Sequence, residues 1–144
     1  MTEALGEFWI HSVEEGAALR LVCLSPEWPD YFWAELKAPG LECRSRVSAF
    51  EPRPDRLSDL FQEMAKAWKG WKGGKVWQSL EGELKLTCTM DATGHVQISV
   101  RLSEGTPYRW RIETNLYTES GALDRLAKEA LAFQRVLDAE QPRR

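Results

Sequence analysis

Hydrophobic and polar residues alternate along most of this chain, which is typical of strands that bury one face. The clearest example is residues 96–102, where Val96, Ile98 and Val100 alternate with polar residues. The same period-two pattern predicts six further strands, at 8–13, 18–25, 31–38, 41–50, 84–90 and 110–116. Short turns separate most neighbours, so we expect antiparallel pairing, because parallel strands need long crossover connections.

Two segments instead repeat their hydrophobic residues every three or four positions, which predicts amphipathic helices. The first stripe contains Leu57, Leu60, Phe61, Met64, Trp68 and Trp71, and the second contains Leu123, Leu126, Ala130, Phe133 and Leu137. Asp55 and Ser120 precede these stripes and are candidate N-caps, because their side-chain oxygens can accept hydrogen bonds from unpaired backbone N–H groups. Gly70, Gly73 and Gly74 are expected to end the first helix.

The order of elements is strands, helix, strands, helix, which favours an α+β fold. We expect a single antiparallel β-sheet of about six to seven strands with two helices packed on one face. No linker divides the sequence, so the prediction is one domain over residues 1–144, with a polar tail at 141–144.

Composition narrows the class of protein. The chain has 144 residues, 19 basic and 22 acidic, for a net charge of −3, which argues against nucleic acid as a partner. No apolar run approaches the roughly 20 residues that span a bilayer, and the first residues lack signal-peptide features. We therefore expect a cytoplasmic protein with no membrane partner.

Three cysteines, Cys23, Cys43 and Cys88, fall in the apolar phase of predicted strands and are expected to be buried thiols. They lie far apart and form no closely spaced ligand pair. A zinc site built from them with His11 or His95 is therefore not predicted, and the sequence indicates no metal or cofactor.

A tryptophan-rich corner follows the first helix, with Trp68, Trp71 and Trp77 around a glycine-rich turn. These side chains either fill the junction between helix and sheet, as large aromatics usually do, or form a platform for a ligand. Alternation places Glu81 and Glu83 on one face of the next strand, and Glu81 adjoins the corner. If the corner binds a ligand, the candidate residues are Trp71, Trp77, Glu81 and His95.

The sequence lacks the motifs that position a catalytic nucleophile, a phosphate loop or a dinucleotide site. His95 with Asp91 has the residue types of a general base and its orienting acid, but no serine or cysteine is placed beside it by a motif. We therefore predict no catalytic residues.

Several arginines fall in the polar phase of the predicted strands or beside them. They are Arg44, Arg46, Arg101, Arg109 and Arg111. Arginine is enriched at protein interfaces, so these residues are candidates for binding a partner. A solvated sheet face is the alternative for each of them.

Three motifs carry a resemblance to a known family. They are W-K-G-W at 68–71, W-Q-S-L-E-G-E-L at 77–84 and D-A-T-G-H-V at 91–96. The combination resembles an uncharacterised family of small bacterial proteins with no known activity. More remotely, the order of elements is similar to that of immunity proteins paired with WapI-type wall-associated toxins. Neither resemblance assigns a role to any residue.

The missing catalytic motifs and the remote immunity-protein resemblance favour a non-enzymatic protein-binding module, and more narrowly a toxin-neutralising protein. The alternative is a small-ligand-binding protein or enzyme that uses the tryptophan-rich corner. A self-assembling module is a third hypothesis. The sequence leaves open whether the protein is a monomer or a homodimer.

Overall fold

A computed structural model describes residues 4–24, 30–49, 56–105 and 108–139 of the chain. Its strands are β1 Ala4–His11, β2 Ala18–Leu24, β3 Tyr31–Ala38, β4 Leu41–Ser48, β5 Lys75–Gln78, β6 Leu84–Met90, β7 His95–Glu104 and β8 Trp110–Glu119. Its helices are α1 Leu57–Lys66 and α2 Leu123–Ala139, the second preceded by a 3-10 turn at Ser120–Ala122. The α+β class and the antiparallel pairing are confirmed.

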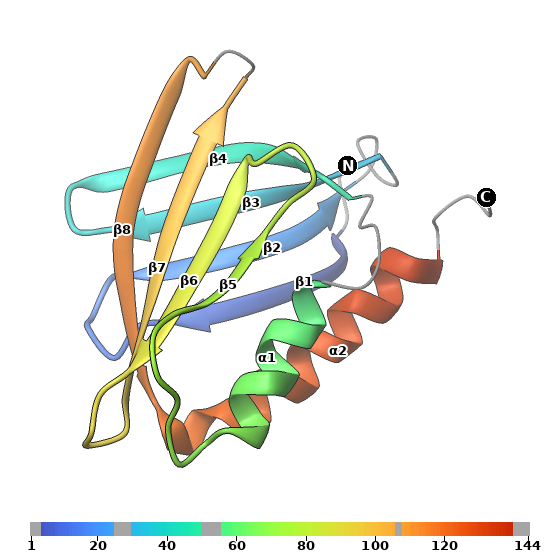
Figure 1. Cartoon of the computed structure of the whole chain (residues 1–144). Coiled ribbons are helices and arrows are strands. Elements are labelled where there is room, and N and C mark those ends of the chain that lie inside the picture. The colour runs from blue at the N-terminus through green and yellow to red at the C-terminus, as the bar shows by residue number, and fades with distance from the viewer. Residues whose placement is uncertain (1–3, 25–29, 50–55, 106–107, 140–144) are drawn as a thin grey trace.

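The prediction of one sheet of six to seven strands is wrong. The strands form two four-stranded meanders, sheet A with the order β1-β2-β3-β4 and sheet B with the order β5-β6-β7-β8 (Figure 1). Alternation reveals which residues share a face, but it does not reveal which strands are hydrogen-bonded. The break falls between β4 and β5, which α1 separates along the chain.

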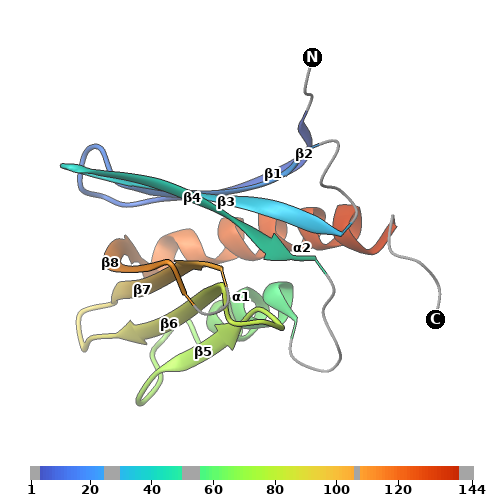
Figure 2. The same cartoon turned by 90° about the horizontal axis from the view of Figure 1, so that it is seen from above.

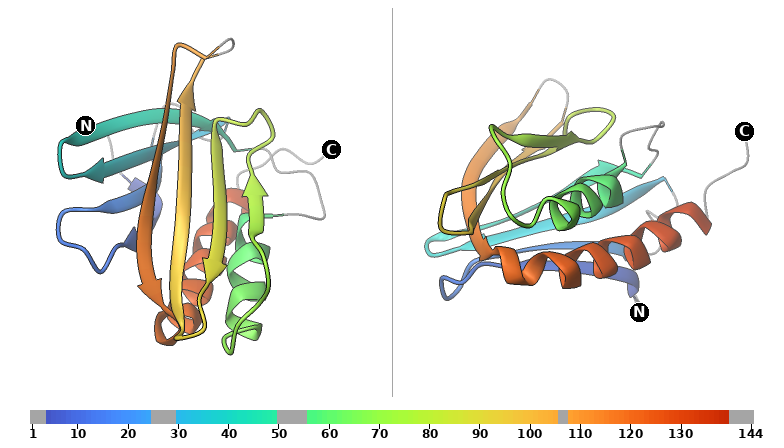
Figure 3. Two further views of the ribbon diagram at one scale, coloured as in Figure 1. Left: turned by 60° about the vertical axis from the view of Figure 1, so that its left-hand side comes forward. Right: turned by 60° about the horizontal axis from the view of Figure 1, so that its bottom comes forward.

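The two sheets stack as layers, and their strands cross at a large angle (Figures 1 and 2). The helices cover the side on which the sheets diverge (Figure 3). There α2 packs on β1, α1 packs on β5, and the two helices pack on each other. The inner face of sheet A is thus covered by α2 and sheet B, whereas its outer face points away from the rest of the molecule (Figure 2).

Aromatic side chains hold α1 and α2 against sheet A. Phe133 of α2 meets Phe32 of β3 edge to face, with ring centroids 5.6 Å apart, and Phe8 of β1 meets Phe61 of α1 at 5.1 Å. All four rings are fully buried. Complete burial of a side chain of this size contributes about 1.5–3 kcal/mol, so this cluster is a main source of stability.

The ends of the helices differ from the prediction. Helix α1 ends at Lys66, so Trp68 and Trp71 lie beyond it, and Trp68 is exposed. Asp55 lies outside the described residues, as does the predicted tail at 141–144. The backbone N–H of Arg56 donates to Asp59 Oδ2 at 3.1 Å. Ser120 begins the 3-10 turn instead of capping α2.

A buried polar joint connects the two sheets. The Glu83 carboxylate accepts the backbone N–H of Ser48 at 2.9 Å and the hydroxyl of Ser79 at 2.8 Å. Beside it, the Ser45 hydroxyl of β4 donates to the carbonyl oxygen of Ser103 in β7 at 2.8 Å. Glu83 therefore satisfies donors from both sheets, which explains why a carboxylate is tolerated in the interior.

The expectation that Glu81 and Glu83 share a face is wrong. A turn at 79–82, with Gly82 at a φ of +78°, interrupts the alternation before β6 begins. As a result Glu81 is exposed and Glu83 is buried.

The cysteine prediction holds for two residues. Cys23 and Cys88 are fully buried, whereas Cys43 is only half-buried. Neither helix in the described part of the chain is both long and apolar enough to cross a membrane. One domain over residues 1–144 stays a prediction.

Candidate functional site

The outer face of sheet A carries a continuous row of aromatic and arginine side chains. Across the strands, Trp9 pairs with Arg20, Arg20 with Glu35, and Glu35 with Arg44. In the next row Trp33 pairs with Arg46. We call the set the aromatic–arginine face, and it comprises Trp9, His11, Arg20, Tyr31, Trp33, Glu35, Arg44 and Arg46.

Stacking fixes these side chains against one another. The Arg44 guanidinium lies 4.0 Å from the centre of the Trp33 ring, and the Arg46 guanidinium lies 5.5 Å from that of Tyr31. Trp9 stacks in parallel on His11, with centroids 5.0 Å apart. Cation–π contacts of this kind contribute about 0.5–1 kcal/mol at exposed sites, so they order the face more than they stabilise the fold.

The arginines of this face differ in how far their charge is already satisfied. Arg20 is bound on both sides, to Glu7 at 2.7 Å and to Glu35 at 3.0 Å. Arg44 reaches only 4.0 Å from Glu35, and its side chain is 55% exposed. Within the described ranges Arg46 makes no ion pair. Arg44 and Arg46 therefore present open guanidinium groups on an aromatic base.

A cleft of about 240 Å³ adjoins one end of the aromatic–arginine face. Tyr31 and Arg46 form its wall on the sheet A side, and Glu81, Glu83 and Glu104 line the opposite side. The predicted partner-binding residue Arg46 and the predicted ligand-binding residue Glu81 thus share one cleft. None of the described residues forms a cluster of His, Cys, Asp and Glu suited to a metal ion.

The tryptophan-rich corner is mostly interior. Trp77 is 3% exposed, and Trp71 is half-buried and donates its indole N–H to the carbonyl oxygen of Cys88 at 3.1 Å. Among the residues the structure describes, the indole N–H of Trp77 has no hydrogen-bond partner. These two rings therefore fill the junction between α1 and sheet B, which matches the first of the two interpretations.

The four candidate ligand residues do not form one site. Glu81 lies before β6, whereas His95 follows the turn after β6. The strand between them rises about 20 Å, at about 3.3 Å per residue. His95 Nδ1 instead lies within its own turn, 3.2 Å from Asp91 Oδ2 and 2.8 Å from Thr93 Oγ1.

The five candidate arginines are divided between the two sheets. Arg44 and Arg46 lie on sheet A, whereas Arg101 and Arg111 lie on sheet B and Arg109 lies just before β8. The outer faces of the two sheets point in opposite directions, so these residues do not form one surface (Figure 2).

Sequence reasoning missed Trp9, Tyr31, Trp33 and Arg20 as members of a surface. The alternation in the sequence could have identified them, because each lies at a position of its strand that faces away from the core. Their sequence neighbours Phe8, Phe32 and Leu21 face the core and are buried. Large aromatic side chains at outward-facing positions indicate a binding surface, because such side chains are normally buried in the core.

Comparison with known proteins identifies a family. No curated protein and no solved structure is significantly similar to the chain. A model of a family of unknown function, DUF6228, matches residues 11–136. This confirms the predicted membership of an uncharacterised family, whereas the motif pattern and the immunity-protein resemblance stay predictions. The chain belongs to the DUF6228 family.

Proposed function

We propose that this protein is a non-enzymatic binding module that docks a partner protein on the aromatic–arginine face. The observation that supports this function is the presence of Trp9, Tyr31, Trp33 and exposed arginines on one open sheet face. Tryptophan, tyrosine and arginine are the residues that dominate binding energy at protein interfaces. On this face they are also pre-ordered by stacking, which lowers the entropy lost on binding.

The charges of the face define the kind of partner. Arg44 and Arg46 favour carboxylates placed opposite them, and the rings between them favour a flat apolar surface. The adjoining cleft, with Glu81 and Glu104, suits a basic side chain at the edge of the same partner. A folded protein with an acidic patch meets these requirements.

A nucleic acid fits this face less well. Arg20 at its centre is already neutralised by Glu7 and Glu35, and the chain as a whole carries a charge of −3. Phosphate backbones require a surplus of unpaired cations, because affinity comes largely from neutralised phosphates.

Neutralisation of a toxin is the narrower form of this proposal. It is supported by the remote resemblance to immunity proteins and by the absence of a catalytic motif in the sequence. A cytoplasmic location stays a prediction.

Affinity capture from the protein's own organism tests this function when four baits are compared by quantitative mass spectrometry. The baits are the wild type, Trp33→Ala, Arg44→Glu and Arg111→Glu. The last makes the same charge change on the outer face of sheet B and is the control. We expect one stoichiometric protein that is captured by the wild type and the control and lost with the two sheet A variants. Equal capture by all four baits, or capture of RNA in place of protein, would contradict the proposal.

A further inference from the structure

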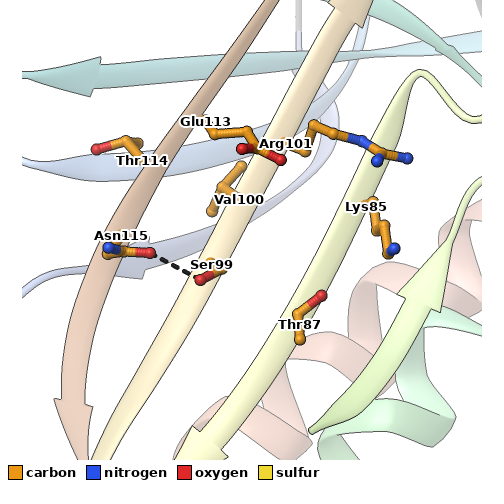
Figure 4. A pocket seen from close by; sticks show the side chains of 8 residues that line it. All are labelled: Lys85, Thr87, Ser99, Val100, Arg101, Glu113, Thr114 and Asn115. Carbon is orange, nitrogen blue, oxygen red and sulfur yellow. Dashed lines mark hydrogen bonds between the residues drawn. The ribbon is translucent and has the colours of Figure 1, made fainter.

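A second cavity lies on the outer face of sheet B, away from the aromatic–arginine face. Its volume is about 240 Å³, and strands β6, β7 and β8 form its floor (Figure 4). The polar side chains that line it include Lys85, Thr87, Ser99, Arg101, Glu113 and Asn115. They come from three consecutive strands, which are neighbours in the sheet.

Two positive charges are placed side by side in this cavity. Lys85 lies directly opposite Arg101 in the β6–β7 register, a position where like charges repel. Arg101 has a carboxylate neighbour on its other side, because it also lies opposite Glu113 in the β7–β8 register. Its guanidinium nevertheless extends over β6 toward Lys85 (Figure 4). In the described part of the chain neither cation forms an ion pair.

Arg101 also has an unsatisfied hydrogen bond. Its Nε–H is shielded from solvent and has no acceptor among the described residues. A buried donor without a partner is unfavourable, and a guanidinium donor more so than a neutral one. Both the repulsion with Lys85 and the missing acceptor would be relieved by one negatively charged group bound between the two side chains.

Neutral polar groups complete the lining of the cavity. The Ser99 hydroxyl donates to Asn115 Oδ1 at 2.7 Å, and the amide nitrogen of Asn115 points away from Lys85 and Arg101 (Figure 4). The Thr87 hydroxyl lies beside the Lys85 side chain (Figure 4). Guanidinium, ammonium and hydroxyl groups are common hydrogen-bond donors to an oxyanion.

We infer that this cavity is a binding site for an oxyanion, a phosphate or a carboxylate group, held by Lys85 and Arg101. Glu113 lies on the opposite wall and opposes the binding of a highly charged anion, unless it accepts a hydrogen bond from the ligand. This inference is independent of the proposed function, because it uses the other sheet and none of the residues of the aromatic–arginine face.

Titration of the isotope-labelled protein with inorganic phosphate, followed by amide chemical shifts at constant ionic strength, tests the inference. We expect saturable shifts at residues 85–87, 99–101 and 113–115. Lys85→Gln and Arg101→Gln should each weaken binding about ten-fold or more, since each removes a charge-assisted hydrogen bond. Glu113→Gln should strengthen binding. Lys72→Gln, which removes an exposed charge in the loop after α1, is the matched control and should bind as the wild type does.

A parallel titration with acetate separates the two sources of the anion. Tighter binding of phosphate assigns the site to phosphate groups, and tighter binding of acetate assigns it to carboxylates. The inference is overturned if neither anion gives saturable shifts at these residues up to tens of millimolar. It is also overturned if Lys85→Gln and Arg101→Gln bind as tightly as Lys72→Gln.

Discussion

Replacement of Glu83 by alanine should destabilise the protein strongly, because this residue joins the two sheets. The residue is 9% exposed, and its carboxylate accepts two hydrogen bonds, from the Ser48 N–H at 2.9 Å and the Ser79 hydroxyl at 2.8 Å. A hydrogen bond to a charged group contributes about 1.5–3 kcal/mol. Glu83→Ala removes two such hydrogen bonds, and water that enters the position of the lost side chain replaces them in part. We therefore expect the free energy of unfolding to fall by about 3–5 kcal/mol.

A graded series of variants makes this prediction specific. Glu83→Gln keeps the shape and one acceptor oxygen, so it should lose about 1–2 kcal/mol. Glu81→Ala is the matched control, because Glu81 lies two positions before Glu83, in the turn at 79–82, and is exposed. It should change stability by less than about 0.5 kcal/mol, as surface substitutions usually do.

Urea denaturation followed by tryptophan fluorescence measures these differences in stability. Trp77 is a suitable probe, because it is buried in the native protein and lies just before the turn at 79–82. The urea concentration at the midpoint of unfolding should be lower for Glu83→Ala than for the wild type. The slope of the free energy of unfolding against urea concentration should stay unchanged if the two sheets still unfold together. The reasoning is refuted if Glu83→Ala loses less than about 1 kcal/mol, or if Glu81→Ala loses as much as Glu83→Ala.

Two further predictions concern titratable groups. Burial raises the pKa of Cys23 and Cys88 to about 12 and also raises the pKa of Cys43, but only Cys43 is partly accessible to a reagent. At pH 8 a thiol reagent should therefore modify only Cys43 in the native protein and all three thiols in denaturant. Rapid modification of two or more native thiols would contradict this assignment. Hydrogen bonds, first from the Thr93 hydroxyl and then from the His95 N–H, lower the pKa of Asp91 below its ordinary value of 3.8. A lowered folded-state pKa stabilises the fold above the ordinary value, and this contribution is lost as the pH falls through the folded-state pKa. Asp91→Asn should therefore be less stable than the wild type at neutral pH, and the difference should shrink below pH 3.8; a difference independent of pH would show that these bonds do not favour the charged carboxylate.

Much of the secondary structure could be predicted because alternation is a local property. The strands at 31–38 and 84–90 were predicted with their observed bounds, and the turn at 91–95 joins β6 to β7 as expected. Strand β5 was missed, because K-V-W-Q is only four residues long and has a single buried side chain, Trp77. The division into two sheets was also missed, because strand pairing depends on contacts between distant residues.

For the candidate site, the exposure of single residues could be predicted from the local sequence, whereas their neighbours in space could not. Arg44 and Arg46 were identified as candidates because their exposure follows from their phase in one strand. Their setting on Trp33 and Tyr31 depends on the β3–β4 register, which the sequence does not specify directly. The ion pairs of Arg20 likewise need three strands to align.

The anion cavity of sheet B was not predicted for the same reason. Arg101 was identified by its polar phase, but it was grouped with the other arginines as part of a partner surface. Its proximity to Lys85 depends on the β6–β7 register, and its orphaned Nε–H depends on the packing of side chains.

The most direct test of the account is the dissociation constant of the purified complex between this protein and its captured partner, measured by calorimetry for Arg44→Glu and Arg111→Glu. Reversal of an interfacial charge on an aromatic base should cost about 2 kcal/mol or more, so Arg44→Glu should weaken binding about thirty-fold or more. Arg111→Glu, on the opposite outer face, should leave the constant within about two-fold of wild type. Equal affinity for the wild type and Arg44→Glu, or a larger loss with Arg111→Glu, would contradict the assignment of binding to sheet A.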